Sequence, residues 1–187
     1  MQAYFTTAAA LARPLYLIRP ENLTDWAADR PVARRWLEHH DWRGAPGSVL
    51  VLPGEDGELA GALGGVREAG CLLRDVAAVA SALPPGDYRL ADSAATDSEL
   101  CALAWGLGQY CFGRYKSAEA PAPRRLLWPE HVDSARVLNA LEADRLLRDL
   151  VNTPAEDMGP AELEAAARSL ANTFDAACEV VEGDALL

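Results

Sequence analysis

The chain has 187 residues, of which 50% are hydrophobic and 24% are charged, so it is long and apolar enough to bury a folded core. Its 28 acidic residues outnumber its 17 basic residues and give a formal net charge of -11. Because nucleic-acid binding depends on neutralising phosphates with Lys and Arg, this balance argues against a nucleic-acid partner.

The N-terminal part of the chain predicts one strand followed by two helices. The strand is the apolar run Leu15–Ile18. Residues 24–40 predict a helix with one break, and Pro31 fits the first turn of the second half, where its missing N–H is no loss. Trp26 and Trp36 supply large apolar side chains that anchor this region.

The next segment carries the clearest hairpin signal in the chain. Two strands, Ser48–Leu52 and Glu58–Leu63, are joined by the turn sequence Pro-Gly-Glu-Asp-Gly. A short helix at Leu72–Ala80 and a strand at Tyr88–Ala91 are predicted to follow.

The strongest helix signal spans Asp97–Tyr115. Thr96 and Glu99 have the spacing of a capping box. Gly106 and Gly108 weaken a helix, so we expect them to pack closely against a neighbouring backbone. Apolar residues recur at the helical period, namely Leu100, Leu103, Ala104, Leu107 and Cys111. Residues 124–130 then predict a strand.

A long helix at His131–Val151 is predicted to be apolar on two sides, with Leu146 and Leu150 nearly opposite the others. The main stripe contains Val137, Ala140, Leu141, Leu147 and Val151. Such a helix is expected either between two structural units or in the middle of one large core. A further helix is predicted to begin at Pro160, and Cys178–Glu182 predicts a final strand.

Strands and helices therefore alternate along the chain, without an internal repeat or a low-complexity segment. This alternation predicts an α/β fold with a mostly parallel or mixed sheet and helices on both faces.

The cysteine pattern and the apolar segments predict a cytoplasmic protein. The four cysteines, Cys71, Cys101, Cys111 and Cys178, include no CxxC pair and no spacing typical of zinc, so we expect buried, reduced thiols. The N-terminus lacks the basic region of a signal peptide. No stretch approaches the roughly 20 apolar residues that a membrane span needs, so no membrane partner is predicted.

No common catalytic motif is present in the sequence, which has no G-x-S-x-G, no P-loop and no H-E-x-x-H. His39 and His40 are predicted to end a helix, where a cation is favourable, and His131 is predicted to lie on the surface. The carboxylates Glu156, Asp157, Glu162 and Glu164 cluster, but helix caps and a solvated helix face explain them. We therefore predict no catalytic residue and no metal ligand in this chain.

Glycines form the one candidate ligand site. Gly61, Gly64 and Gly65 precede a predicted helix, and a glycine-rich loop at a strand-to-helix junction can cradle a phosphate. Their spacing does not match G-x-G-x-x-G, so a tight turn between Gly61 and Gly70 is the alternative.

The segment Arg148–Ala171 carries a distinctive run of residues, namely Arg148, Asp149, Leu150, Val151, Asn152, Thr153, Pro154, Ala155 and Pro160. This run resembles the leucyl aminopeptidase family of two-metal exopeptidases, at the point where the N-terminal domain leads into the catalytic domain. Glu156 departs from the pattern, where Asn is commoner. The segment Phe112–Ser117 and the hairpin at 48–65 are similar to parts of the family's N-terminal domain.

This resemblance implies three regions and a reaction. Residues 1–130 would form a macro-domain-like N-terminal domain, residues 131–158 an interdomain helix and linker, and residues 159–187 the start of a truncated catalytic domain. The family removes N-terminal residues from peptides with two divalent ions, zinc or manganese. Its metal ligands and catalytic side chains lie beyond residue 187, and Lys116, the only lysine, is not carried over as catalytic.

The resemblance therefore implies a non-catalytic chain that is inactive alone and whose partner is its own catalytic domain. Homo-oligomers, hexamers in some relatives, are also implied. Two other functions are alternatives: a free-standing macro-like module that binds a nucleotide or ADP-ribose near Gly61 to Gly65, and a role in transcription, which the net charge opposes.

Overall fold

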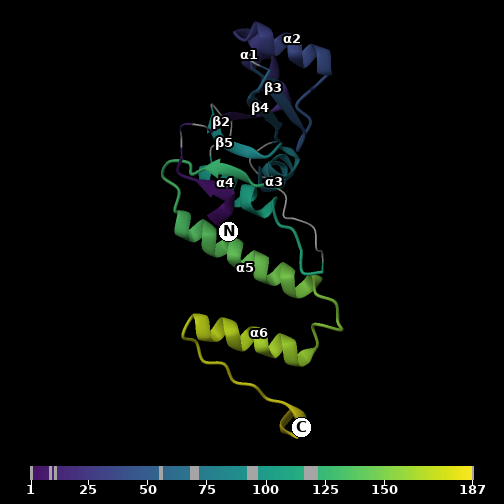
Figure 1. Ribbon diagram of the computed structural model, residues 1–187, viewed down its shortest axis with the longest axis vertical. Helices are drawn as coiled ribbons and strands as arrows, with labels where there is room; N and C mark the ends of the chain where they lie inside the picture. Colours follow the sequence, from purple (N-terminus) through teal and green to yellow (C-terminus); the bar gives the residue numbers. More distant parts are fainter. Residues whose placement is uncertain are drawn as a thin grey trace. The chain divides into compact units, whose positions relative to one another are not determined.

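The computed structural model describes residues 2–8, 10, 12–54, 57–67, 72–91, 97–115 and 122–186 (Figure 1). It divides into two compact units, Met1–Asp144 and Arg145–Leu187. The first unit contains a six-stranded mixed sheet with helices, and the predicted α/β class is confirmed. None of the described helices combines the length and the apolar composition that crossing a bilayer requires.

The sheet has the strand order β1-β6-β5-β2-β4-β3. Its strands are β1 (Phe5–Thr6), β2 (Arg13–Ile18), β3 (Val49–Pro53), β4 (Leu59–Gly65), β5 (Gly86–Ala91) and β6 (Arg124–Leu127). Neighbours pair in parallel, except that β3 and β4 form the predicted antiparallel hairpin, with Leu50 opposite Leu63. The short strand β1 was not predicted, because two residues carry no periodicity of their own.

The helices agree with the predicted breaks and starts in most places. They are α1 (Leu23–Ala28), α2 (Pro31–His40), α3 (Leu72–Ala82), α4 (Ser98–Leu107), α5 (Ser134–Asn152) and α6 (Pro160–Thr173), with 3-10 turns η1 (Gln2–Tyr4), η3 (Pro20–Asn22) and η5 (Gly183–Leu186). The predicted break before Pro31 and the predicted start at Pro160 are confirmed.

Helices cover both faces of the sheet. Successive side chains of β2 belong in turn to two apolar clusters, one on each face. Leu15 and Leu17 belong to a cluster with side chains of α3, α4 and α5. Tyr16 and Ile18 belong to the other cluster, which includes Leu37 of α2 and side chains of α1. Figure 1 shows α1 and α2 beside β3 and β4. Because apolar side chains of β2 point to both faces of the sheet, each face needs a layer of helices to bury them.

Helix α4 is shorter than predicted, since it ends at Leu107 rather than at Tyr115. Its N-cap is Asp97, whose side chain accepts a hydrogen bond from the Leu100 amide at 2.9 Å, whereas Thr96 lies outside the described residues. The predicted close packing against a neighbouring backbone is confirmed for Gly108, where a Cβ would overlap the backbone of Ala77 in α3, but at Gly106 a Cβ would meet the Leu141 side chain instead. These glycines favour an early end to the helix.

Helix α5 begins at Ser134 rather than at His131. The backbone of His131 is left-handed, with φ of 64°, which a helix does not accommodate. The Asp133 carboxylate instead accepts a hydrogen bond from the Arg136 amide at 3.0 Å and caps the helix.

The strand predicted at Cys178–Glu182 is wrong. The structure describes these residues, which follow α6 without joining a β-ladder. A strand requires a neighbour to take its backbone hydrogen bonds, and none lies beside this segment among the described residues. A run rich in Val therefore does not by itself make a strand.

The packing around Gly108 predicts that the addition of one methyl group there lowers the stability of the fold. Gly108→Ala places its Cβ against the backbone of Ala77, which cannot move aside as a flexible side chain would. We expect a loss of about 1–3 kcal/mol in the free energy of unfolding, measured by urea denaturation. Gly113→Ala is the matched control, because a Cβ at that position would have no atom within 4 Å and the change should be close to neutral. Equal midpoints for the two variants would contradict this account.

Candidate functional site

The structure places Gly61, Gly64 and Gly65 inside β4 rather than in a loop or a tight turn. A Cβ at Gly64 would lie 2.8 Å from Val79 Cγ1, and one at Gly65 would overlap the backbone of Ala45. These glycines are therefore explained by close approach of the surrounding chain to β4. The last part of the predicted glycine-rich loop, residues 68–70, lies outside the described residues.

An ion pair joins the end of β4 to the first turns of α3. The Asp75 carboxylate accepts hydrogen bonds from the Arg67 amide at 2.9 Å and from Arg67 Nη2 at 2.8 Å. The side chain of Asp75 is 3% exposed and that of Arg67 is 42% exposed. Burial raises the pKa of Asp75, but the hydrogen bonds and charge of Arg67 outweigh it and lower the pKa below its ordinary value of 3.8. Asp75 thus already accepts hydrogen bonds from the Arg67 amide and guanidinium, which are donors that a phosphate bound here would need.

The histidines and carboxylates do not converge on a metal centre. His39 and His40 are exposed at the end of α2, as predicted, and His131 is exposed. Glu162 accepts a hydrogen bond from the Gly159 amide at the start of α6, and Glu164 pairs with an arginine one turn later. Within the described ranges, no group of three or more His, Cys, Asp or Glu side chains could hold a metal ion.

The cysteines differ in exposure. Cys101 is fully buried, and burial raises the pKa of its thiol to about 12, so it stays protonated and unreactive. The prediction of buried thiols is thus confirmed for Cys101 but wrong for Cys111 and Cys178, which are exposed free thiols. Cys111 follows the end of α4, so the helical period no longer points it inward. Cys71 lies outside the described residues.

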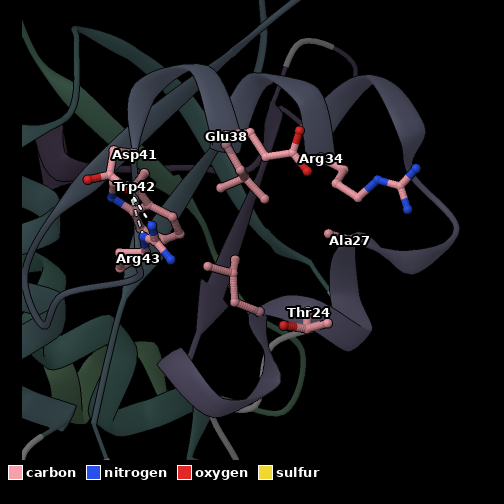
Figure 2. Close-up of a pocket in the computed structure, with 9 residues that line it drawn as sticks. Thr24, Ala27, Arg34, Glu38, Asp41, Trp42 and Arg43 are labelled. Atoms are coloured by element: carbon pink, nitrogen blue, oxygen red, sulfur yellow. Dashed lines mark hydrogen bonds and ion pairs between the residues drawn. The ribbon is translucent and has the colours of Figure 1, made fainter.

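Two pockets lie against α1 and α2. The α1–α2 pocket has a volume of about 330 Å³ and is lined by residues that include Thr24, Ala27, Arg34, Glu38, Asp41, Trp42 and Arg43. Figure 2 shows Asp41, Trp42 and Arg43 together at one end of it and Arg34 at the other. Its charges have both signs, and Arg43 is already paired with Asp41 at 2.7 Å.

The second pocket, called the aromatic pocket, has a volume of about 360 Å³ and lies between α1, α2 and strands β2 to β4. Its lining includes Tyr16, Trp26, Arg30, Trp36, Leu52 and Pro53. The rings of Tyr16 and Trp26 meet edge to face, with centroids 5.1 Å apart. The Arg30 guanidinium lies 4.8 Å from the Trp26 ring. This cluster was not predicted from the sequence; the spacing of Trp26 and Arg30 by one helical turn was the only local signal.

The fold and these contacts define an α/β domain with a mixed sheet, in which the described residues assemble no metal centre. The family model described as M17 aminopeptidase, N-terminal domain, matches residues 13–129. The chain therefore belongs to the M17 aminopeptidase family, and the resemblance found in the sequence is confirmed. A search of curated proteins gave no match.

Solved structures support the same family. The cytosol aminopeptidase from Coxiella burnetii is 31% identical with a TM-score of 0.86, and the match covers 100% of this chain and 41% of that one. The bottromycin maturation enzyme BotP is 27% identical with a TM-score of 0.68, over 94% of this chain and 40% of that one. A mutant of tomato leucine aminopeptidase shares the fold, at 16% identity and a TM-score of 0.64, over 91% of this chain and 42% of that one. The chain thus spans about two fifths of the length of these proteins.

The ion pair at the end of β4 predicts a pH dependence of stability. Because the folded-state pKa of Asp75 is lowered, its contribution is present above the unfolded pKa and is lost as the pH falls through the folded value. Asp75→Asn should therefore lower the free energy of unfolding by about 1–3 kcal/mol at neutral pH, and the difference from the native chain should shrink below about pH 4.

The exposed carboxylate of Asp41 provides the matched control. Its pair with Arg43 is largely solvated, with side-chain exposures of 78% and 82%, so Asp41→Asn should change stability by less than about 0.5 kcal/mol. Denaturation curves collected from acidic to neutral pH test both variants. A constant difference between Asp75→Asn and the native chain across that range would contradict the role of the charge.

Proposed function

We propose that this chain is the N-terminal, non-catalytic part of a metal-dependent aminopeptidase that removes N-terminal amino acids from peptides. The family match over residues 13–129 carries the proposal, and the 31% identity to a cytosol aminopeptidase supports it. Residues 1–130 would form the N-terminal domain, residues 131–158 the interdomain helix and linker, and residues 159–187 the start of the catalytic domain.

Exposed apolar side chains in the second unit support a partner surface. Val151 of α5 is 75% exposed, and Leu163 of α6 and Phe174, which follows it, are 54% and 72% exposed. Apolar surface of this kind is typical of interaction sites. The partner that we propose for this surface is the remainder of the catalytic domain of the same enzyme, and the enzyme would form a homo-oligomer such as a hexamer.

The catalytic domain would supply two divalent ions, zinc or manganese, which activate a water molecule and polarise the scissile carbonyl. The bottromycin maturation enzyme BotP has been solved in complex with Mn. The proposed location is the cytoplasm, which fits the free thiols of Cys101, Cys111 and Cys178. The family match favours this function over a free-standing nucleotide-binding module, and the packing around Gly64 and Gly65 also removes the main reason to propose one.

A chimera tests the proposed function directly. In it, this chain replaces the matching part of the Coxiella burnetii cytosol aminopeptidase, which supplies the remaining sequence. We expect manganese- or zinc-dependent release of leucine from leucinamide by the chimera and none by the purified 187-residue chain with the same ions. Two results would contradict the proposal: metal-dependent release of leucine by the chain alone, or no release of leucine by a chimera that circular dichroism shows to be folded.

The exposed Phe174 allows the proposed partner surface to be tested separately. In the isolated chain, Phe174→Asp should change the free energy of unfolding by less than about 0.5 kcal/mol, because the side chain is 72% exposed. In the chimera it should reduce activity tenfold or more, because the remainder of the catalytic domain would bury an unpaired charge. Ser169→Asp, on the exposed surface of α6, should leave the chimera active. Full activity of the Phe174→Asp chimera would exclude this surface.

A further inference from the structure

The aromatic pocket combines apolar walls with a single cation. Tyr16 and Trp26 meet edge to face on one side, Trp36 and Leu52 contribute further apolar surface, and the volume of about 360 Å³ lies within the range of small-molecule sites. Among the described residues that line it, Arg30 is the only charged one.

Arg30 is held in place without a carboxylate partner. Its Nη1 donates a hydrogen bond to the Trp26 carbonyl at 2.7 Å, and its guanidinium lies 4.8 Å from the Trp26 ring and 5.8 Å from the Tyr16 ring. No acidic side chain of the described residues forms an ion pair with it, although the chain carries 28 acidic residues. The Nε and Nη2 donors are therefore open to an anion, and their planar arrangement suits a carboxylate.

We propose that the aromatic pocket binds a carboxylate carried on a compact apolar or aromatic group, with Arg30 as the partner of the carboxylate and the rings of Tyr16, Trp26 and Trp36 around the apolar group. A free aromatic acid and the C-terminus of a peptide that ends in an apolar residue share this chemistry. The site is independent of the proposed peptidase activity, because all of these residues lie in the first unit.

The surroundings of Arg30 reduce the conformational entropy that its side chain loses when a ligand binds. Stacking and the bond to the Trp26 carbonyl fix the guanidinium before a ligand arrives, and Pro31 restricts the backbone that follows it. The α1–α2 pocket lacks this character, because Glu38 and Asp41 lie beside its arginines. Of these two pockets, the aromatic pocket therefore has the charge that suits an apolar acid.

Binding is tested by titrating the full 187-residue chain with N-acetyl-phenylalanine and with its neutral amide. The acetyl group removes the free amine, so neither probe is an aminopeptidase substrate. We expect calorimetry to show at least about tenfold tighter binding of the acid than of the amide, and added salt should weaken the binding of the acid. The indole N–H signals of Trp26 and Trp36 should shift in NMR spectra when the acid binds.

An acetylated tripeptide acid that ends in Phe distinguishes the two possible sources of the carboxylate. Tight binding of the tripeptide supports a peptide C-terminus, whereas binding of the small acid alone supports a free acid.

Two variants test whether Arg30 is the partner of the ligand's carboxylate. Arg30→Gln should reduce the affinity for the acid about tenfold, to the level of the amide, and Arg35→Gln, an exposed arginine of α2 outside the pocket, should leave it unchanged. Equal affinities of the native chain for the acid and the amide, or no binding of the acid at millimolar concentration, would overturn the proposal. An equal loss in the Arg35→Gln chain would overturn it as well. The comparison of acid with amide uses the native chain, so it holds even if Arg30→Gln does not fold.

Discussion

The burial of β2 on both faces is the constraint on which the first unit depends. This strand pairs in parallel with β4 on one side and β5 on the other, so its backbone groups are used within the sheet. Leu15 and Leu17 are 0% exposed toward one cluster, and Ile18 is 4% exposed toward the other. Each face needs its own helical layer. The same alternation turns Tyr16 toward α1 and α2 and so builds one wall of the aromatic pocket.

Features with a local cause could be predicted from the sequence. Pro31 begins a helix because of its own ring, and Gly57, shortly before β4, takes the left-handed φ of 81° that a glycine readily adopts. Features that depend on residues far away in the sequence could not be predicted. The segment Cys178–Glu182 has the composition of a strand but no neighbour among the described residues, and β1 is a strand only because β6 lies beside it.

The candidate sites follow the same rule. The glycines of β4 suggested a phosphate loop because glycine-rich loops are recognised by composition, whereas their actual cause, the approach of Ala45 and Val79, is visible only in the folded chain. Arg67 and Asp75 meet because the end of a strand faces the first turns of a helix. Arg30 reaches Tyr16 only because the sheet and the α1–α2 pair are stacked. No spacing rule connects these residues in advance.

The hydrogen bond from Trp36 Nε1 to the Val51 carbonyl, at 2.9 Å, has a consequence for the behaviour of the protein in solution. Strand β3 stands at the end of the strand order, and such strands tend to recruit strands from other molecules. The indole occupies an acceptor that an incoming strand would need, and Pro53 at the end of β3 has no N–H to offer. The same tryptophan that lines a pocket thus hinders the addition of a foreign strand at this edge of the sheet.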